Sequence, residues 1–181
     1  TRFSTVTGVQ TCALPISWSR MMGPDGLKEC AEVSVINNNY MLKMMEKIPG
    51  VTHAFQGNGI VRQEQIRYSF EELKKKYDIG SEDMNCRMGD YGIPWFWSSH
   101  HPWVIPEPMT IEPCESYTKE DIEEYCKVVE ICAKEAMENP SLLKNAPHNT
   151  AMHRRINEEE LDDPSKWAIT WRAYKRKHNI K

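Results

Sequence analysis

The sequence lacks several features that would assign it to a common function class. No apolar run approaches the roughly 20 residues that a membrane-spanning helix needs. The formal net charge is only −3 over 181 residues, so no strong field for nucleic acid or anionic lipid is indicated. No P-loop, G-x-S-x-G or H-E-x-x-H motif occurs. We therefore expect that the protein binds neither nucleic acid nor a membrane. The absence of these catalytic motifs leaves the activity unassigned.

The six cysteines also lack the spacing of a metal site or redox pair. None forms C-x-x-C, and no two lie with histidine at zinc-finger spacing. Cys126 and Cys132 fall in one helical pattern, where a thiol serves as a small apolar side chain. Cys114 has no basic residue or histidine beside it in sequence, so a nucleophilic role is unsupported. We expect reduced thiols in a cytoplasmic protein rather than a disulfide framework.

Residues 1–16, TRFSTVTGVQTCALPI, resemble a translated sequencing-library adapter. Residues 6–16 match its constant part, and residues 3–5 span a variable index. On this resemblance we expect 1–16 to be an artefact without ordered structure, and we discount Cys12. A signal peptide is the alternative, but the segment lacks a basic start followed by a long apolar core. The natural reading frame is then expected to begin upstream.

From residue 17 onward the pattern indicates an α+β domain. Apolar residues recur at helical spacing between Leu27 and Met45, and Pro49-Gly50 ends that helix. Further helices are expected at 70–77, 81–91, 118–138, 140–144 and from 165, and strands at 51–55, 65–68, 95–99 and 109–112. This order predicts a small mixed or antiparallel sheet with helices on one face. We assign it to residues 17–145, followed by a C-terminal extension, 146–181, with a final cationic helix whose basic end faces water.

Residues 95–116, WFWSSHHPWVIPEPMTIEPCES, combine aromatic side chains with titratable groups. His100 and His101 are adjacent, so in a strand at most one can line a given pocket, and a shared metal site would need another ligand. Glu112 and Glu115 could act as acid or base only if buried near a reacting group; tethering the following helix is the simpler interpretation. These four residues are our cleft-lining candidates. We name no certain catalytic residue and predict no metal site.

Several segments, in order, resemble the glycine cleavage system P-protein family (glycine dehydrogenase, decarboxylating) in its second-subunit form. They are MMGPDGLKE at 21–29, DYGI at 90–93, HHPWVIPEPMTIEPCESYTKEDIEEY at 100–125, and NAPH at 145–148 followed by Thr150 and Arg154-Arg155. Many members read G-F-H-P-P-T after DYG, whereas this chain reads GIPWFW at 92–97. A family histidine role therefore does not carry over directly to His100 or His101. The Trp-rich ending WAITWRAYKRK resembles a variant branch.

The resemblance implies the C-terminal small domain of a fold-type-I pyridoxal-phosphate enzyme. Such an enzyme decarboxylates glycine and passes the aminomethyl group to the lipoylated H-protein. In the family a lysine in an H-K-T context of the large domain holds the cofactor as a Schiff base. No lysine here has that context: those at 28, 43 and 47 fall in a predicted helix, and 74–76 in a charged face.

This chain would then cover a cofactor cleft carried by a missing domain and would be inactive alone. Its implied partners are the first P-protein subunit, the lipoylated H-protein and glycine. Two alternatives stay open. One is the small domain of another fold-type-I decarboxylase or aminotransferase. The other is a non-enzymatic binding module, metal-dependent through His100, His101 and a glutamate.

Overall fold

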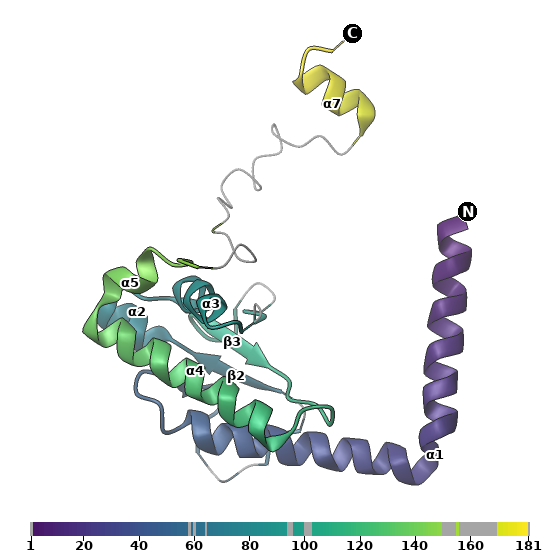
Figure 1. Cartoon of the computed structure of the whole chain (residues 1–181), viewed down its shortest axis with the longest axis horizontal. Helices are drawn as coiled ribbons and strands as arrows, with labels where there is room; N and C mark the ends of the chain where they lie inside the picture. Colours follow the sequence, from purple (N-terminus) through teal and green to yellow (C-terminus); the bar gives the residue numbers. More distant parts are fainter. Residues whose placement is uncertain are drawn as a thin grey trace.

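The computed structural model describes residues 2–57, 59, 61–63, 65–93, 96–99, 103–149, 155 and 170–180. For residues 2–12 the description covers the backbone only. It has the expected α+β architecture (Figure 1). The elements in order are α1 (Arg2–Met45), β1 (Thr52–His53), β2 (Ile66–Ser69), α2 (Glu71–Tyr77), α3 (Ser81–Asp90), β3 (Pro108–Ile111), α4 (Lys119–Glu138), α5 (Pro140–Lys144) and α7 (Trp171–Lys177).

The sheet has the strand order β1-β2-β3, and both pairings are antiparallel. In β2, Ile66 and Tyr68 point to one face and are buried, whereas Arg67 between them points to the other face and is partly exposed. In Figure 1, α4 lies across the sheet. The sheet therefore buries one face under helices, as the sequence predicted.

The prediction of a regular strand at 95–99 is wrong. The described part of this segment makes one bridge, between Trp97 and Thr110. The backbone N–H of Thr110 donates to Trp97 O at 2.7 Å, and the Thr110 hydroxyl donates to Ser98 O at 2.9 Å. Prolines at 94 and 102 flank the segment, and a proline cannot donate to a ladder. This edge is thus held by a few contacts rather than a repeating register.

Helix α1 changes direction at Gly23. Gly23 has a φ of 64°, outside the helical region, and Pro24 follows it. Because proline lacks the N–H that would continue the helical ladder, the chain starts a new helix there. The second half of α1 runs along the body, and the first half turns away (Figure 1).

Residues 2–16, which we expected to be disordered, lie in the first half of α1 as helix. A helix satisfies its own backbone hydrogen bonds, so its formation does not require contact with the body. The proposed origin of this segment and the domain divisions at 16 and 145 stay predictions.

Helix α4 supplies much of the core. Its buried face comprises Ile122, Cys126, Val128, Val129, Cys132, Ala133 and Ala136. This face packs toward α1, α2 and α3. Cys126 and Cys132 are free thiols, and burial raises the pKa of each to about 12. They are therefore inert apolar packing groups, as predicted.

None of the helices that the structure describes is long and apolar enough to cross a membrane. Helix α7 stands apart from the body that holds the sheet (Figure 1). The final helix was expected to begin at residue 165. Residues 156–169 lie outside the described part, and the described helix begins at Trp171, where the Thr170 side chain accepts a hydrogen bond from the N–H of Ala173.

Candidate functional site

Two motifs far apart in the sequence, DYG at 90–92 and NAPH at 145–148, meet at the C-terminal end of α3. Asp90 Oδ1 accepts hydrogen bonds from the backbone N–H groups of His148 and Asn149, at 2.7 and 2.9 Å. Only 1% of the Asp90 side chain is exposed. Burial alone would raise the pKa of Asp90, but the two amides and Arg87 together hold it below its usual range. The ionised carboxylate therefore anchors the loop that follows α5.

Arg87 joins this anchor to α4. Its Nη1 donates to Asp90 Oδ2 at 3.0 Å, and its Nε and Nη2 donate to the two oxygens of Glu135 at 2.8 and 2.9 Å. The Tyr91 hydroxyl also donates to Glu135, at 2.7 Å. The hydrogen bonds from Arg87 lower the pKa of Glu135. Such a bidentate arginine–carboxylate pair fixes the relative orientation of the two side chains as well as pairing their charges.

Asp83, near the start of α3, binds the same loop at a second point. Its Oδ1 accepts from Arg155 Nη1 at 2.8 Å, and its Oδ2 accepts from Lys144 Nζ at 3.1 Å. Arg155 also donates to the carbonyls of Ala146 and Leu143, at 2.9 and 2.7 Å. The segment from α5 to Arg155 is therefore fastened to α3 by two buried carboxylates. We call this group the α3 clasp: Asp83, Arg87, Asp90, Glu135 and Arg155.

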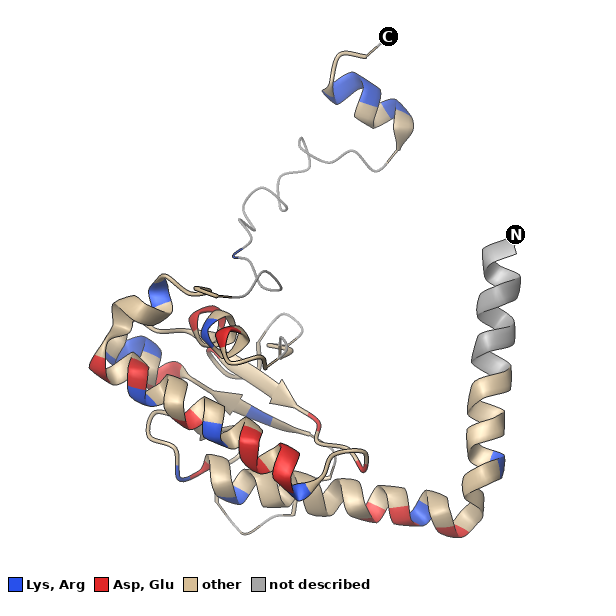
Figure 2. Cartoon of the chain, viewed as in Figure 1, with Lys and Arg blue, Asp and Glu red and all other residues tan. Residues whose placement is uncertain are grey.

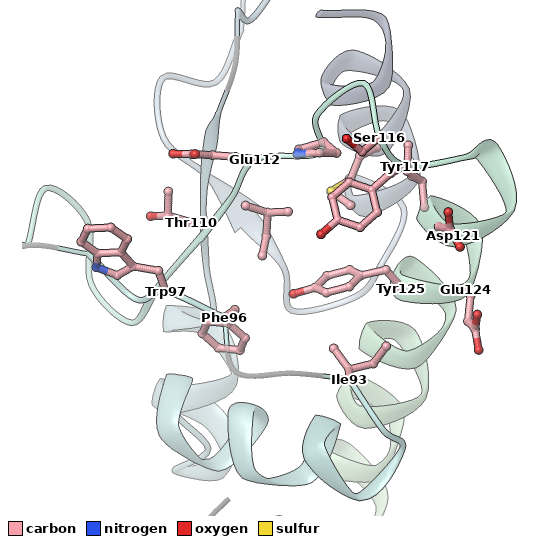
Figure 3. A pocket seen from close by; sticks show the side chains of 14 residues that line it. Ile93, Phe96, Trp97, Thr110, Glu112, Ser116, Tyr117, Asp121, Glu124 and Tyr125 are labelled. Atoms are coloured by element: carbon pink, nitrogen blue, oxygen red, sulfur yellow. The ribbon is translucent and has the colours of Figure 1, made fainter. Parts of the chain in front are cut away.

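The body also has an open cavity of about 520 Å³ between β3, the chain after α3 and the first turns of α4. Aromatic side chains form much of its wall: Phe96, Trp97, Tyr117 and Tyr125. Figure 3 shows the rings of Tyr117 and Tyr125 side by side, with both hydroxyl ends directed into the cavity. We call it the aromatic groove. Burial raises the pKa of Tyr125, so its hydroxyl stays protonated.

The rim of the aromatic groove is acidic. Glu112, Asp121 and Glu124 line it, and no lysine or arginine is among its described lining residues. In Figure 3, Glu112 lies on the strand side, and Asp121 and Glu124 lie on the outer side of α4. Hydrogen bonds from the backbone N–H and the hydroxyl of Thr118, both at 2.8 Å, lower the pKa of Asp121. This capping box leaves the rim negatively charged.

The structure separates the four candidates that the sequence named. Glu112 lies at the rim of the aromatic groove, with its carboxylate directed away from Tyr117 and Tyr125 (Figure 3). Glu115 instead accepts a hydrogen bond from the Ser34 hydroxyl of α1 at 3.2 Å. His100 and His101 lie outside the described residues. Among the residues that are described, no group of three histidine, cysteine or acidic side chains could hold a metal ion.

Glu107, in the VIPEP run, has a structural role that the residue pattern did not indicate. Its Oε2 accepts the backbone N–H of Ser81 at 2.6 Å, at the start of α3, and its own carbonyl accepts the N–H of Phe70 at 2.9 Å. The chain takes a positive φ of 45° at Glu107. A Cβ added at Gly80 would lie only 2.4 Å from Glu107 Oε2. Glu107 thus ties the β3 approach to the first turn of α3.

The α3 clasp was missed as well, although the sequence contained one signal for it. Asp90 lies at the C-terminal end of a helix, where the macrodipole disfavours a carboxylate. Such a misplaced charge indicates a specific partner. The partner amides belong to His148 and Asn149, 58 and 59 residues along the chain, so the residue pattern could not identify them.

Comparison with known proteins gives one family. The model described as "Glycine dehydrogenase, C-terminal domain" matches residues 30–148. The "Probable glycine dehydrogenase (decarboxylating) subunit 2" of Pyrococcus horikoshii is 32% identical over 162 residues, which cover 88% of this chain and 30% of that protein. The protein of the same name from Thermotoga maritima is 37% identical over 139 residues, which cover 76% and 27%. The chain thus spans less than a third of the length of these curated relatives.

A solved structure shares the fold. It is a glycine decarboxylase (P-protein) of the glycine cleavage system, in inhibitor-bound form, with a TM-score of 0.52. It is 15% identical, and the match covers 64% of this chain and 24% of that one. At this identity the likeness concerns the fold alone. The family match spans the second half of α1, the sheet, the aromatic groove and the clasp as far as His148, and so the chain belongs to the family of glycine dehydrogenase C-terminal domains.

Proposed function

We propose that this chain is the C-terminal domain of the second subunit of a glycine dehydrogenase (decarboxylating). The match to residues 30–148 carries the proposal. The structure adds that DYG and NAPH, which the family resemblance singled out separately, are in contact through Asp90. The complete protein would decarboxylate glycine and pass the aminomethyl group to a lipoylated H-protein in the cytoplasm, with the first P-protein subunit as its partner.

The complete enzyme would use pyridoxal phosphate, which withdraws electrons from the α-carbon of a bound amino acid. The aromatic groove of this chain does not fit that cofactor. Its described lining offers no lysine for covalent attachment and no cation to pair with the phosphate. Glu112, Asp121 and Glu124 would instead repel a phosphate. The rest of the polypeptide is therefore proposed to carry the cofactor lysine, and this domain to cover the cleft.

In this proposal the α3 clasp makes the domain a rigid cover. It fixes the loop after α5 to α3 and joins α3 to α4 through Arg87 and Glu135. Glu112, at the rim of the aromatic groove, is proposed to line the cleft on the sequence argument alone. Glu115 is proposed to act indirectly, by holding the following turn to α1 through Ser34. His100 and His101 remain proposed lining residues on the sequence argument alone.

The test uses the complete protein with the upstream polypeptide, the first subunit and a lipoylated carrier. We expect release of labelled CO₂ from carboxyl-labelled glycine and none above background from other amino acids. A parallel assay follows amino transfer to 2-oxo acids, which would identify an aminotransferase. Release of CO₂ from another amino acid, or amino transfer without CO₂ release, would contradict the glycine dehydrogenase proposal.

The 181-residue chain serves as the matched control. After incubation with pyridoxal phosphate and reduction with borohydride, intact-mass measurement should show no stoichiometric adduct. The complete protein should show one adduct, on a lysine outside this chain. A single specific lysine adduct within residues 17–181 would overturn the assignment of this chain as a cover without the cofactor lysine.

A further inference from the structure

The end of the body that holds the aromatic groove carries a concentrated negative charge. Residues 112–124 include six carboxylates and one lysine: Glu112, Glu115, Lys119, Glu120, Asp121, Glu123 and Glu124. Lys119 is already paired with Glu123 at 3.2 Å. Figure 2 shows the acidic residues gathered on the first half of α4. Among the described residues, no ion pair joins Glu112, Asp121 or Glu124 to a cation.

Helix α7 has the complementary character. Its residues are Trp171, Arg172, Ala173, Tyr174, Lys175, Arg176 and Lys177, with four cations and no carboxylate. The rings of Trp171 and Tyr174 stack at 5.4 Å between centroids, and Trp171 is 67% exposed. The helix stands apart from the body (Figure 1), and its lysines and arginines are coloured blue in Figure 2. An aromatic stack flanked by cations suits a groove with aromatic walls and an acidic rim.

We propose that α7 docks in the aromatic groove of a second copy of this chain. Trp171 and Tyr174 would lie against the aromatic walls, and the cations would face Glu112, Asp121 and Glu124. A cavity of about 520 Å³ lies within the usual size of ligand pockets, roughly 300–1,000 Å³.

The reach of the chain permits this exchange. Fourteen residues, 156–169, separate Thr170 from Arg155, and Arg155 is fastened to the body through Asp83. A segment of that length spans at most about 50 Å. Each copy carries both α7 and the aromatic groove, so two copies can fill both sites by one reciprocal contact, the usual arrangement of a symmetric dimer. This pairing does not depend on the catalytic proposal.

The experiment mixes unlabelled and nitrogen-15-labelled 181-residue chains and couples amines to touching carboxylates with a carbodiimide. We expect cross-links from Lys175 to Glu112, Asp121 or Glu124 that join one light and one heavy peptide. The Lys144–Asp83 pair, at 3.1 Å, is the internal positive control and should link within one copy. In 1 M salt the mixed cross-links should be lost, because the screening length falls to about 3 Å.

A charge-reversal variant sharpens the test. Lys175→Glu with Arg176→Glu should abolish the mixed cross-links and raise the Kd for self-association, measured by sedimentation, by at least about tenfold. The matched control is Lys75→Glu with Lys76→Glu on α2, whose side chains are 68% and 67% exposed. It changes the net charge equally and should leave both readouts unchanged.

Three results would overturn the proposal. The first is mixed cross-links that are absent while the Lys144–Asp83 link forms. The second is cross-links from α7 to the groove only within one copy, which would assign the groove to the chain's own helix. The third is an equal loss of self-association in the α2 control, which would reduce the effect to net charge.

Discussion

The α3 clasp and the aromatic groove lie on the same small body, but the charged groups of the clasp are paired with opposite charges and, among the residues that the structure describes, those at the rim of the groove are not. In the clasp, the side chain of Asp90 is 1% exposed and that of Arg87 is 13% exposed, and each makes several hydrogen bonds. At the groove, Glu112 and Glu124 are exposed, and within the described part of the chain no cation pairs with them. Buried charges that are fully paired serve the fold. An exposed cluster of negative charges destabilises the fold through mutual repulsion. Its role is therefore better explained by binding to a positively charged partner.

The largest expected effect tests the buried side of this comparison. Replacing Arg87 by Met would leave Asp90 and Glu135 without their shared cation. Because removal of one member of a buried pair strands the other charge, we expect a loss of about 3–5 kcal/mol in the free energy of unfolding. Urea denaturation followed by circular dichroism measures it.

The control for this variant is Lys75→Met in the exposed Lys75–Glu71 pair of α2. Exposed pairs contribute roughly 0–1 kcal/mol, so the control should unfold almost as the parent does. Equal losses in the two variants would mean that the clasp is no stronger than an ordinary surface pair.

A second prediction concerns acid. The folded-state pKa values of Asp90 and Glu135 are lowered, that of Asp90 in spite of its burial. Unfolded carboxyls titrate near 3.9 for Asp and about 4.3 for Glu. The clasp therefore stabilises the fold fully above that range, and the stability is lost as the pH falls through the lower folded values.

Urea unfolding measured from pH 7 down to the acid transition tests this sign. The parent chain should lose stability steadily below about pH 4.5. In Asp90→Asn the curve should be flatter, because one of the titrating groups is gone. A parent curve that rises toward acid, or an Asp90→Asn curve as steep as the parent's, would contradict the role given to Asp90.

The smallest expected effect is at the groove. Glu112→Gln removes a charge from an exposed rim position, and such surface changes shift the free energy of unfolding by about 0.5 kcal/mol or less. The same substitution type in the clasp, Asp90→Asn, should cost clearly more when both are measured by urea denaturation at pH 7. Comparable losses would remove the distinction between the two regions.

The parts of the fold that local signals determine were predictable. The capping pair Thr118 and Asp121 and the apolar stripe of 122–136 define α4, and the structure reproduces both. The Pro49-Gly50 signal placed the end of α1 to within a few residues. Strand pairing is non-local, so the segment at 95–99 was predicted as a strand although it makes a single described bridge.

The candidate site was predictable in part. Glu112 was named and lies at the rim of the groove, whereas Glu115 accepts a hydrogen bond from Ser34; a cleft-lining role for either residue stays a prediction. The clasp could not be derived, because the Asp83–Arg155 and Asp90–His148 contacts span 72 and 58 residues. The family resemblance marked the motifs at both ends of the second contact, and only the fold brought them together.

The close approach of Glu107 to Gly80 couples two positions that are distant in the sequence. Gly80 has an ordinary φ of −103°, so its backbone would tolerate any residue, and the limit is the room that the Glu107 carboxylate occupies. A methyl group at 80 would displace the acceptor of the Ser81 amide at the start of α3. A side chain at residue 80 and the hydrogen bond from Ser81 to Glu107 therefore compete for the same space.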